Sequence, residues 1–187
     1  EASFPVKSTD GGITWNPITD PTGGECYSIF ADDNSTQRIV IASYNRIYFS
    51  SNGGTSFTNI YTNMGSGAAH IGGVFFDGSN IYIGAAKNLV VSTDNGATFT
   101  SNTLTGLPVG RGIISFAGAK AGATTRFFIV GYDLVDIYPG VTGADFNSYK
   151  SIYKMDYAVG ASWIAAATGI SGSNKPFFVD MAENNID

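Results

Sequence analysis

One octapeptide occurs three times in this chain of 187 residues, at a constant interval. It reads STDGGITW from residue 8, SSNGGTSF from residue 50 and STDNGATF from residue 92, so each copy begins 42 residues after the previous one. A fixed period of about 20 to 50 residues indicates a repeat architecture, in which each repeat forms one supersecondary unit. This period constrains the fold more than any other feature of the sequence.

The segments that precede the octapeptides repeat as well. Residues 38–50 (RIVIASYNRIYFS) and 80–92 (NIYIGAAKNLVVS) agree position by position in apolar character, and another apolar run followed by a polar turn precedes each of them. Short runs of Ile, Val, Tyr and Phe separated by Gly, Asn and Asp are typical of β-strands joined by tight turns. No segment keeps an apolar period of 3.6 over about ten residues, so we expect almost no helix.

Four antiparallel strands in about 42 residues are typical of one β-propeller blade. The sequence therefore predicts an all-β fold of about four blades, each of four antiparallel strands. Only one strand precedes the first octapeptide, so the first blade is expected to be incomplete. The fourth unit contains an insertion at 133–150, between its second and third strands. We expect a single propeller segment over residues 1–187, with blade parts at 1–19, 25–60, 71–102, 111–166 and 175–187.

The octapeptide itself has the chemistry of a structural turn. An Asp or Asn side chain at its third place can accept hydrogen bonds from backbone N–H groups further along. Gly at the fifth place can adopt a positive φ, and the aromatic residue at the eighth place is expected to pack in the core. The predicted structural residues are Ser8, Asp10, Gly12, Trp15, Ser50, Asn52, Gly54, Phe57, Ser92, Asp94, Gly96 and Phe99, with Gly160 and Trp163 in the fourth unit.

Calcium binding by these Asp residues is the alternative. It is disfavoured because each copy offers a single carboxylate and the second copy carries Asn52 instead. His70 is the only histidine and has no second His or Cys nearby, which disfavours a transition-metal site. We expect no metal and no cofactor.

The pattern Ser-x-Asp-x-Gly-x-Thr-Trp/Phe resembles the Asp-box, or BNR repeat, of sialidases, sortilin-type receptors, xyloglucan-active glycoside hydrolases and a photosystem assembly factor. The resemblance covers nearly the whole chain. It implies a propeller of six or more blades, so that other polypeptide completes the blades present here. The alternative is a complete small propeller that closes with both termini in one blade. It also implies that the boxes lie between third and fourth strands, on the face away from the active site.

Charge and composition exclude some partners. The formal net charge is −5 and the ten Lys and Arg residues are scattered, which argues against nucleic-acid binding. No apolar run approaches the roughly 20 residues that a membrane-spanning helix needs. The abundance of Gly and aromatic residues with 13% charged residues favours a secreted, periplasmic or cell-surface protein.

Candidate ligand-binding residues lie in segments that depart from the repeat, because such loops often carry function. Those segments are 16–26, 58–73, 100–112 and the insertion at 133–150. The insertion combines carboxylates with tyrosines, which suits a sugar; a surface loop folded over its own aromatic residues is the alternative. Arg111 can bind an anion or pair with a nearby carboxylate. The candidate ligand-binding residues are Asp133, Asp136, Tyr138, Asp145, Tyr149, Arg111 and His70.

No residue is assigned a catalytic role. The sialidases that the chain resembles need a cluster of three arginines, whereas Arg38, Arg46, Arg111 and Arg126 fall at separate strand starts. A G-x-S-x-G nucleophile motif does not occur. The sequence therefore predicts a non-catalytic binding or scaffold module for a protein or a glycan. The alternative is part of a sialidase- or xyloglucanase-like glycoside hydrolase, with the remaining catalytic residues outside this chain.

Overall fold

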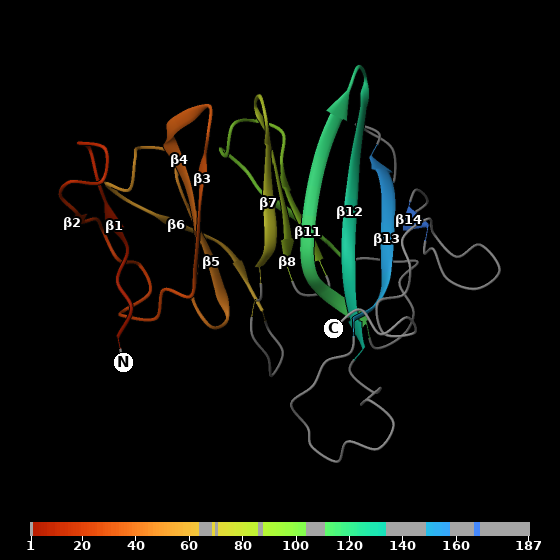
Figure 1. The fold of residues 1–187 in the computed structure, drawn as a ribbon, viewed down its shortest axis with the longest axis horizontal. Helices are drawn as coiled ribbons and strands as arrows, with labels where there is room; N and C mark the ends of the chain where they lie inside the picture. The colour runs from red at the N-terminus through yellow and green to blue at the C-terminus, as the bar shows by residue number, and fades with distance from the viewer. Residues whose placement is uncertain are drawn as a thin grey trace, which may run out of the picture.

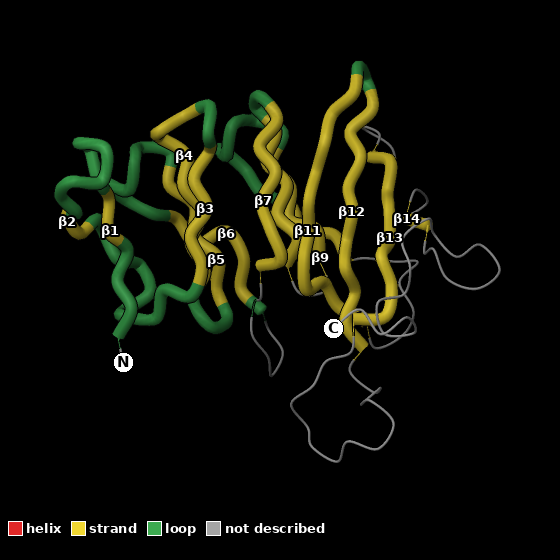
Figure 2. Tube along the Cα trace, viewed as in Figure 1, coloured by secondary structure: helices red, strands yellow, loops and turns green. Residues whose placement is uncertain are grey.

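The structure is a computed structural model that describes residues 2–63, 69, 71–85, 88–103, 111–133, 149–157 and 167–168. Within these ranges the chain forms β-strands and loops and no helix, as Figure 2 shows. The expectation of an all-β fold is therefore confirmed. Asp136, Tyr138, Asp145, His70, Gly160 and Trp163 lie outside the described residues.

The strands form four antiparallel sheets, which we call blades 1 to 4. Blade 1 contains β1 (Val6–Lys7) and β2 (Asn16–Pro17). Blade 2 contains β3 (Ser28–Asp32), β4 (Ser35–Ala42), β5 (Arg46–Ser50) and β6 (Thr58–Thr62). Blade 3 contains β7 (Ile71–Asp77), β8 (Asn80–Ala85), β9 (Asn88–Ser92) and β10 (Thr100–Thr103). Blade 4 contains β11 (Arg111–Ala121), β12 (Thr124–Asp133), β13 (Tyr149–Tyr157) and β14 (Ala167–Thr168).

Each four-stranded blade is a meander, in which every strand pairs with its neighbours in the chain. The prediction of four-stranded antiparallel blades is confirmed for blades 2, 3 and 4. The blades follow one another side by side, with blade 1 and blade 4 at opposite ends of the row (Figure 1). The octapeptides and the turns between first and second strands lie at one end of the strands, which we call the turn face. The connections between second and third strands lie at the other end, which we call the loop face.

The core lies between the blades. Along β8 the side chains alternate: Ile81 and Ile83 belong to a buried cluster shared with blade 2, whereas Tyr82 belongs to a cluster shared with blade 4. All three side chains are fully buried. Strands that are buried on both faces carry continuous apolar runs, which explains the sequence NIYIGA in β8.

Blades 3 and 4 approach each other closely because glycines face Phe116. A Cβ atom at Gly73 would lie 2.2 Å from the Phe116 carbonyl oxygen, and one at Gly84 would lie 2.6 Å from the Phe116 side chain. Any larger residue at Gly73 would have to displace backbone. The packing between these blades therefore depends on the absence of side chains at these positions.

Candidate functional site

The three octapeptides form the turns between β1 and β2, between β5 and β6, and between β9 and β10. In the third copy, the hydroxyl of Ser92 accepts a hydrogen bond from the N–H of Gly96 at 2.8 Å. The carboxylate of Asp94 accepts from the N–H of Thr98 at 2.9 Å and from its hydroxyl at 2.5 Å. These bonds close the turn through side chains of the octapeptide itself.

The first copy repeats this arrangement at the corresponding residues. The hydroxyl of Ser8 accepts from the N–H of Gly12 at 2.7 Å, and Asp10 accepts from the N–H and the hydroxyl of Thr14 at 2.9 and 2.6 Å. The Thr14 bonds are the main cause that lowers the pKa of Asp10 to about 2, and Thr98 does the same for the pKa of Asp94. Both carboxylates are committed to the turn.

The second copy keeps the geometry with a neutral side chain. Asn52 accepts from the N–H of Ser56 at 2.9 Å through its oxygen, as the Asp residues do. Its amide nitrogen then donates to the hydroxyl of Ser56 at 2.8 Å, so the side-chain bond runs in the opposite direction. The hydroxyl of Ser50 accepts from Gly54 at 2.9 Å. Throughout the described residues, no group of three or more His, Cys, Asp or Glu side chains could hold a metal ion.

The aromatic residues at the eighth place differ in environment. The ring of Phe99 packs against Phe49 of blade 2, with centroids 5.2 Å apart, and Phe57 is half-buried. Trp15 is 61% exposed, which differs from the core position expected for it. The reason is its place at the end of the row: Phe99 is covered by the preceding blade, and no described residues form a blade before Trp15.

Three of the candidate ligand-binding residues come together at the loop-face end of blade 4. Arg111 at the start of β11 is paired with Asp133 at the end of β12, and Tyr149 at the start of β13 is paired with Tyr132. The segment 134–148, which contains the other insertion candidates, connects β12 to β13 and lies outside the described residues. The fold thus gathers the backbone positions of Arg111, Asp133 and Tyr149 at one edge.

Arg38 and Arg46 do not share a site. The side chain of Arg38 is buried at the turn face, where it bonds to Asp32, whereas Arg46 is exposed at the opposite, loop-face end of its strand. Arg38 also donates to the Gly78 carbonyl oxygen and to Asn95 in blade 3. Its burial could not be predicted from its own strand, because it results from packing against blade 3.

A pocket of about 340 Å³ opens on the loop face of blade 2. Tyr27 and Tyr44 form part of its wall and are 64% and 53% exposed. Backbone bonds hold both tyrosines in place, since Tyr27 N–H donates to the Ala42 carbonyl oxygen at 2.9 Å and Ala69 N–H donates to that of Tyr44 at 2.6 Å. Among the described residues, those that line it are all uncharged: Tyr27, Ser28, Ala42, Ser43, Tyr44, Ala69 and Ile71.

Sequence reasoning missed this pocket. One feature of the sequence could have indicated it. Tyr44 lies in the turn between the second and third strands, at the position where the next repeat has Ala86. The pocket offers aromatic rings and four hydroxyl groups, and hydrogen bonds between described residues engage none of these hydroxyls. Such a lining can bind a neutral polar ligand, and the described residues contribute no carboxylate or imidazole to it for acid–base chemistry.

Solved structures of β-propellers resemble this chain. The chain matches the GH74 xyloglucanase from Xanthomonas campestris with a TM-score of 0.56 and 18% identity, over 90% of this chain. It also matches an α-L-arabinanase of Penicillium chrysogenum complexed with arabinobiose (TM-score 0.48, 12% identity, 91% of this chain) and YCF48 bound to D1 peptide (0.47, 14%, 89%). The chain spans 26% of the length of the xyloglucanase and 59% of each of the other two.

No family model matches the chain, and no curated protein sequence matches it. The likeness to the xyloglucanase establishes the fold: this chain is made of β-propeller blades. In the described part there is also no helix long and apolar enough to cross a membrane.

Proposed function

We propose that this chain is part of an extracytoplasmic Asp-box β-propeller that binds a glycan on its loop face without catalysing a reaction. The observation that carries the proposal is the pocket between Tyr27 and Tyr44, whose described lining residues are uncharged. Aromatic rings can cover the apolar face of a sugar, and the surrounding hydroxyls can donate to and accept from its hydroxyl groups. A protein ligand on this face is the other outcome that the test distinguishes.

The insertion of blade 4 extends the proposed binding surface. Arg111, Asp133 and Tyr149 begin or end strands at the loop face, on the same side as Tyr44. Asp136, Tyr138 and Asp145 belong to the connecting segment and are proposed to contribute polar and aromatic contacts to the same ligand. We also propose a secreted, periplasmic or cell-surface location, which the composition of the chain favours.

The exposed ring of Trp15 supports the proposal that other polypeptide completes the propeller. The equivalent residue Phe99 is packed against the preceding blade, so a further blade is expected to cover Trp15. That blade can belong to the same polypeptide or to another one.

The test is binding to an array of neutral and acidic oligosaccharides, followed by calorimetry with the strongest binder. Tyr44→Ala should weaken binding at least tenfold, which corresponds to about 1.4 kcal/mol. Trp15→Ala is the matched control, because it removes an exposed aromatic ring far from the loop face and should leave affinity unchanged.

Three outcomes would contradict the proposal. Unchanged affinity in Tyr44→Ala would remove the pocket from the site. Binding to no glycan at all would favour a protein ligand. Release of reducing ends from the bound glycan, lost in Asp136→Asn, would show a glycoside hydrolase instead of a binding module.

A further inference from the structure

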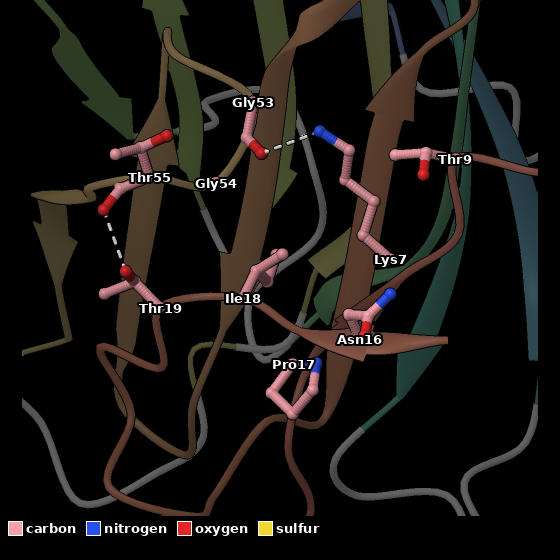
Figure 3. Close-up of a pocket in the computed structure, with 9 residues that line it drawn as sticks. All are labelled: Lys7, Thr9, Asn16, Pro17, Ile18, Thr19, Gly53, Gly54 and Thr55. Atoms are coloured by element: carbon pink, nitrogen blue, oxygen red, sulfur yellow. Dashed lines mark hydrogen bonds between the residues drawn. The ribbon is translucent and has the colours of Figure 1, made fainter. Parts of the chain in front are cut away.

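A second pocket, of about 380 Å³, lies at the seam between blades 1 and 2 on the turn face (Figure 3). Lys7, Thr9 and Asn16 come from blade 1, whereas Gly53 and Thr55 belong to the octapeptide turn of blade 2. The pocket is at the opposite end of the strands from Tyr27 and Tyr44. It is therefore separate from the site proposed above.

The walls of the seam pocket are held together by direct bonds between the blades. Thr19 donates from its N–H to the Gly54 carbonyl oxygen at 3.2 Å and from its hydroxyl to the Thr55 carbonyl oxygen at 2.8 Å. Ile18 packs so tightly on Gly54 that a Cβ atom there would lie 2.7 Å from Ile18 Cδ1. The pocket is thus a fixed feature of the seam.

The cation at this seam has no acidic partner. Lys7 is half-buried, and its ammonium group donates to the Gly53 carbonyl oxygen at 3.3 Å. Among the described residues no carboxylate lies within 4.0 Å of it. The ammonium group of Lys7 is therefore available to an anionic ligand in the pocket that it lines.

The other two seams show what is missing. At the seam of blades 2 and 3, Arg38 pairs with Asp32, and at the seam of blades 3 and 4, Lys120 pairs with Asp77 at 2.8 Å. In the described part of the chain, Arg38 and Lys120 thus each have a carboxylate, whereas Lys7 has none. At the seam of blades 1 and 2, the pocket lies beside Lys7, where the other two seams have an Asp carboxylate.

Two neutral donors face the same pocket. The hydroxyl of Thr9 and the amide of Asn16 line it, and neither takes part in a hydrogen bond between described residues. Pro17 and Ile18 add an apolar wall. One cation and two neutral donors can together bind a singly charged carboxylate. The apolar wall can pack against a compact group that carries this carboxylate.

We propose that the seam pocket binds the carboxylate of a small acidic ligand, with Lys7 as its counter-ion and Thr9 and Asn16 as further donors. The class of ligand is an organic acid with a compact ring, of which an acidic sugar is the example. The proposal does not rest on the loop-face site, and the two sites can fail independently.

The experiment is a titration of the full chain, labelled with ¹⁵N, with sodium glucuronate and with its neutral isostere glucuronamide. Glucuronate should produce saturable shifts of the amide signals of Lys7, Gly53 and Thr55. Glucuronamide should produce none at the same concentrations. Equal shifts with both compounds, or no saturable shift with glucuronate, would overturn the proposal.

Lys7→Met keeps the aliphatic stem and removes the charge. It should weaken glucuronate binding about tenfold or more, as expected for a hydrogen bond to a charged group. Lys7→Arg should restore most of the affinity, and thermal unfolding of each variant shows whether the seam is intact. Unchanged affinity in a folded Lys7→Met variant would refute the assignment, and Tyr44→Ala should leave glucuronate binding unaffected.

Discussion

Arg38 and Asp32 form a buried ion pair in which the guanidinium Nε lies 2.6 Å from Oδ2 of the carboxylate. Their side chains are 9% and 0% exposed. The same guanidinium donates to the Gly78 carbonyl oxygen at 2.6 Å and to Asn95 at 3.0 Å, so it also joins blade 2 to blade 3. The ring of Phe76 lies beneath it, 5.4 Å from the guanidinium carbon.

Arg38→Met should lower the free energy of unfolding by about 3–5 kcal/mol, because it leaves the carboxylate of Asp32 buried without its counter-ion. Urea unfolding at pH 7 measures the change. Lys120→Met is the control, since the Lys120 side chain is 44% exposed and that of Asp77 is 14% exposed, and the loss of this more exposed pair should cost less than about 1 kcal/mol. An equal decrease in the free energy of unfolding in both variants would show that burial does not strengthen the Arg38–Asp32 pair.

The octapeptide carboxylates make the stability depend on pH. The pKa values of Asp10 and Asp94 are lowered from 3.8 to about 2 in the folded chain, so each carboxylate contributes stability that is fully present above 3.8. That contribution should be lost as the pH falls through about 2. Carboxyl ¹³C titration by NMR should find midpoints well below 3.8 for both residues.

Asn52 provides the control for this prediction. Its turn has no carboxylate, so the second octapeptide should not respond to pH in this range. In Asn52→Asp, the Ser56 hydroxyl can turn to donate to the new carboxylate, and the new residue should titrate with a lowered pKa. An ordinary pKa in that variant would show that the Thr hydroxyls in the other two copies are essential for the effect.

Gly96→Ala should destabilise the chain by about 2–4 kcal/mol, because overpacking adds to the strain of a positive φ. Gly96 has φ of 85°, and a Cβ atom there would lie 2.1 Å from Phe49 Cε1. Gly122→Ala is the matched control, since its φ is also positive, 58°, with no atom within 4 Å of the added Cβ. It should cost about 1 kcal/mol in the same denaturation measurement.

Phe99→Ala should cost about 1–3 kcal/mol, because its half-buried ring packs against Phe49. Trp15→Ala should change the free energy of unfolding by less than about 0.5 kcal/mol, because the ring is largely exposed. If Trp15→Ala proved as costly as Phe99→Ala, the ring of Trp15 would have to be covered in solution. Acrylamide quenching in a Trp163→Phe background reports that exposure directly.

The repeat carried most of the information about the fold. The 42-residue period and the apolar runs predicted the meander of four strands, because register and strand ends follow from alternation and turn residues. Each octapeptide joins two paired strands in the structure, which are the third and fourth strands in blades 2 and 3. The exposure of Trp15 did not follow from the motif, since it depends on which blade lies next to the residue.

The candidate sites depended on contacts that no local pattern records. The pocket at Tyr27 and Tyr44 arises because the start of β3, the end of β4 and Ala69 meet, and these positions are far apart in the chain. Likewise, the burial of Arg38 results from blade 3 and not from its own strand. The insertion at 133–150 was predicted as a candidate site because its whole length departs from the repeat. Tyr44 differs from the repeat in one side chain only, so the same criterion did not select it.

The hairpin of β11 and β12 is longer than its counterparts in blades 2 and 3, and its tip extends past them (Figure 1). The turn face is therefore not level. A flat surface that approaches it will touch the exposed tip at residues 121–124 before it reaches the octapeptide turns. A macromolecule that docks on this face must have a recess for the hairpin, whereas a small solute can reach the seam pocket unhindered.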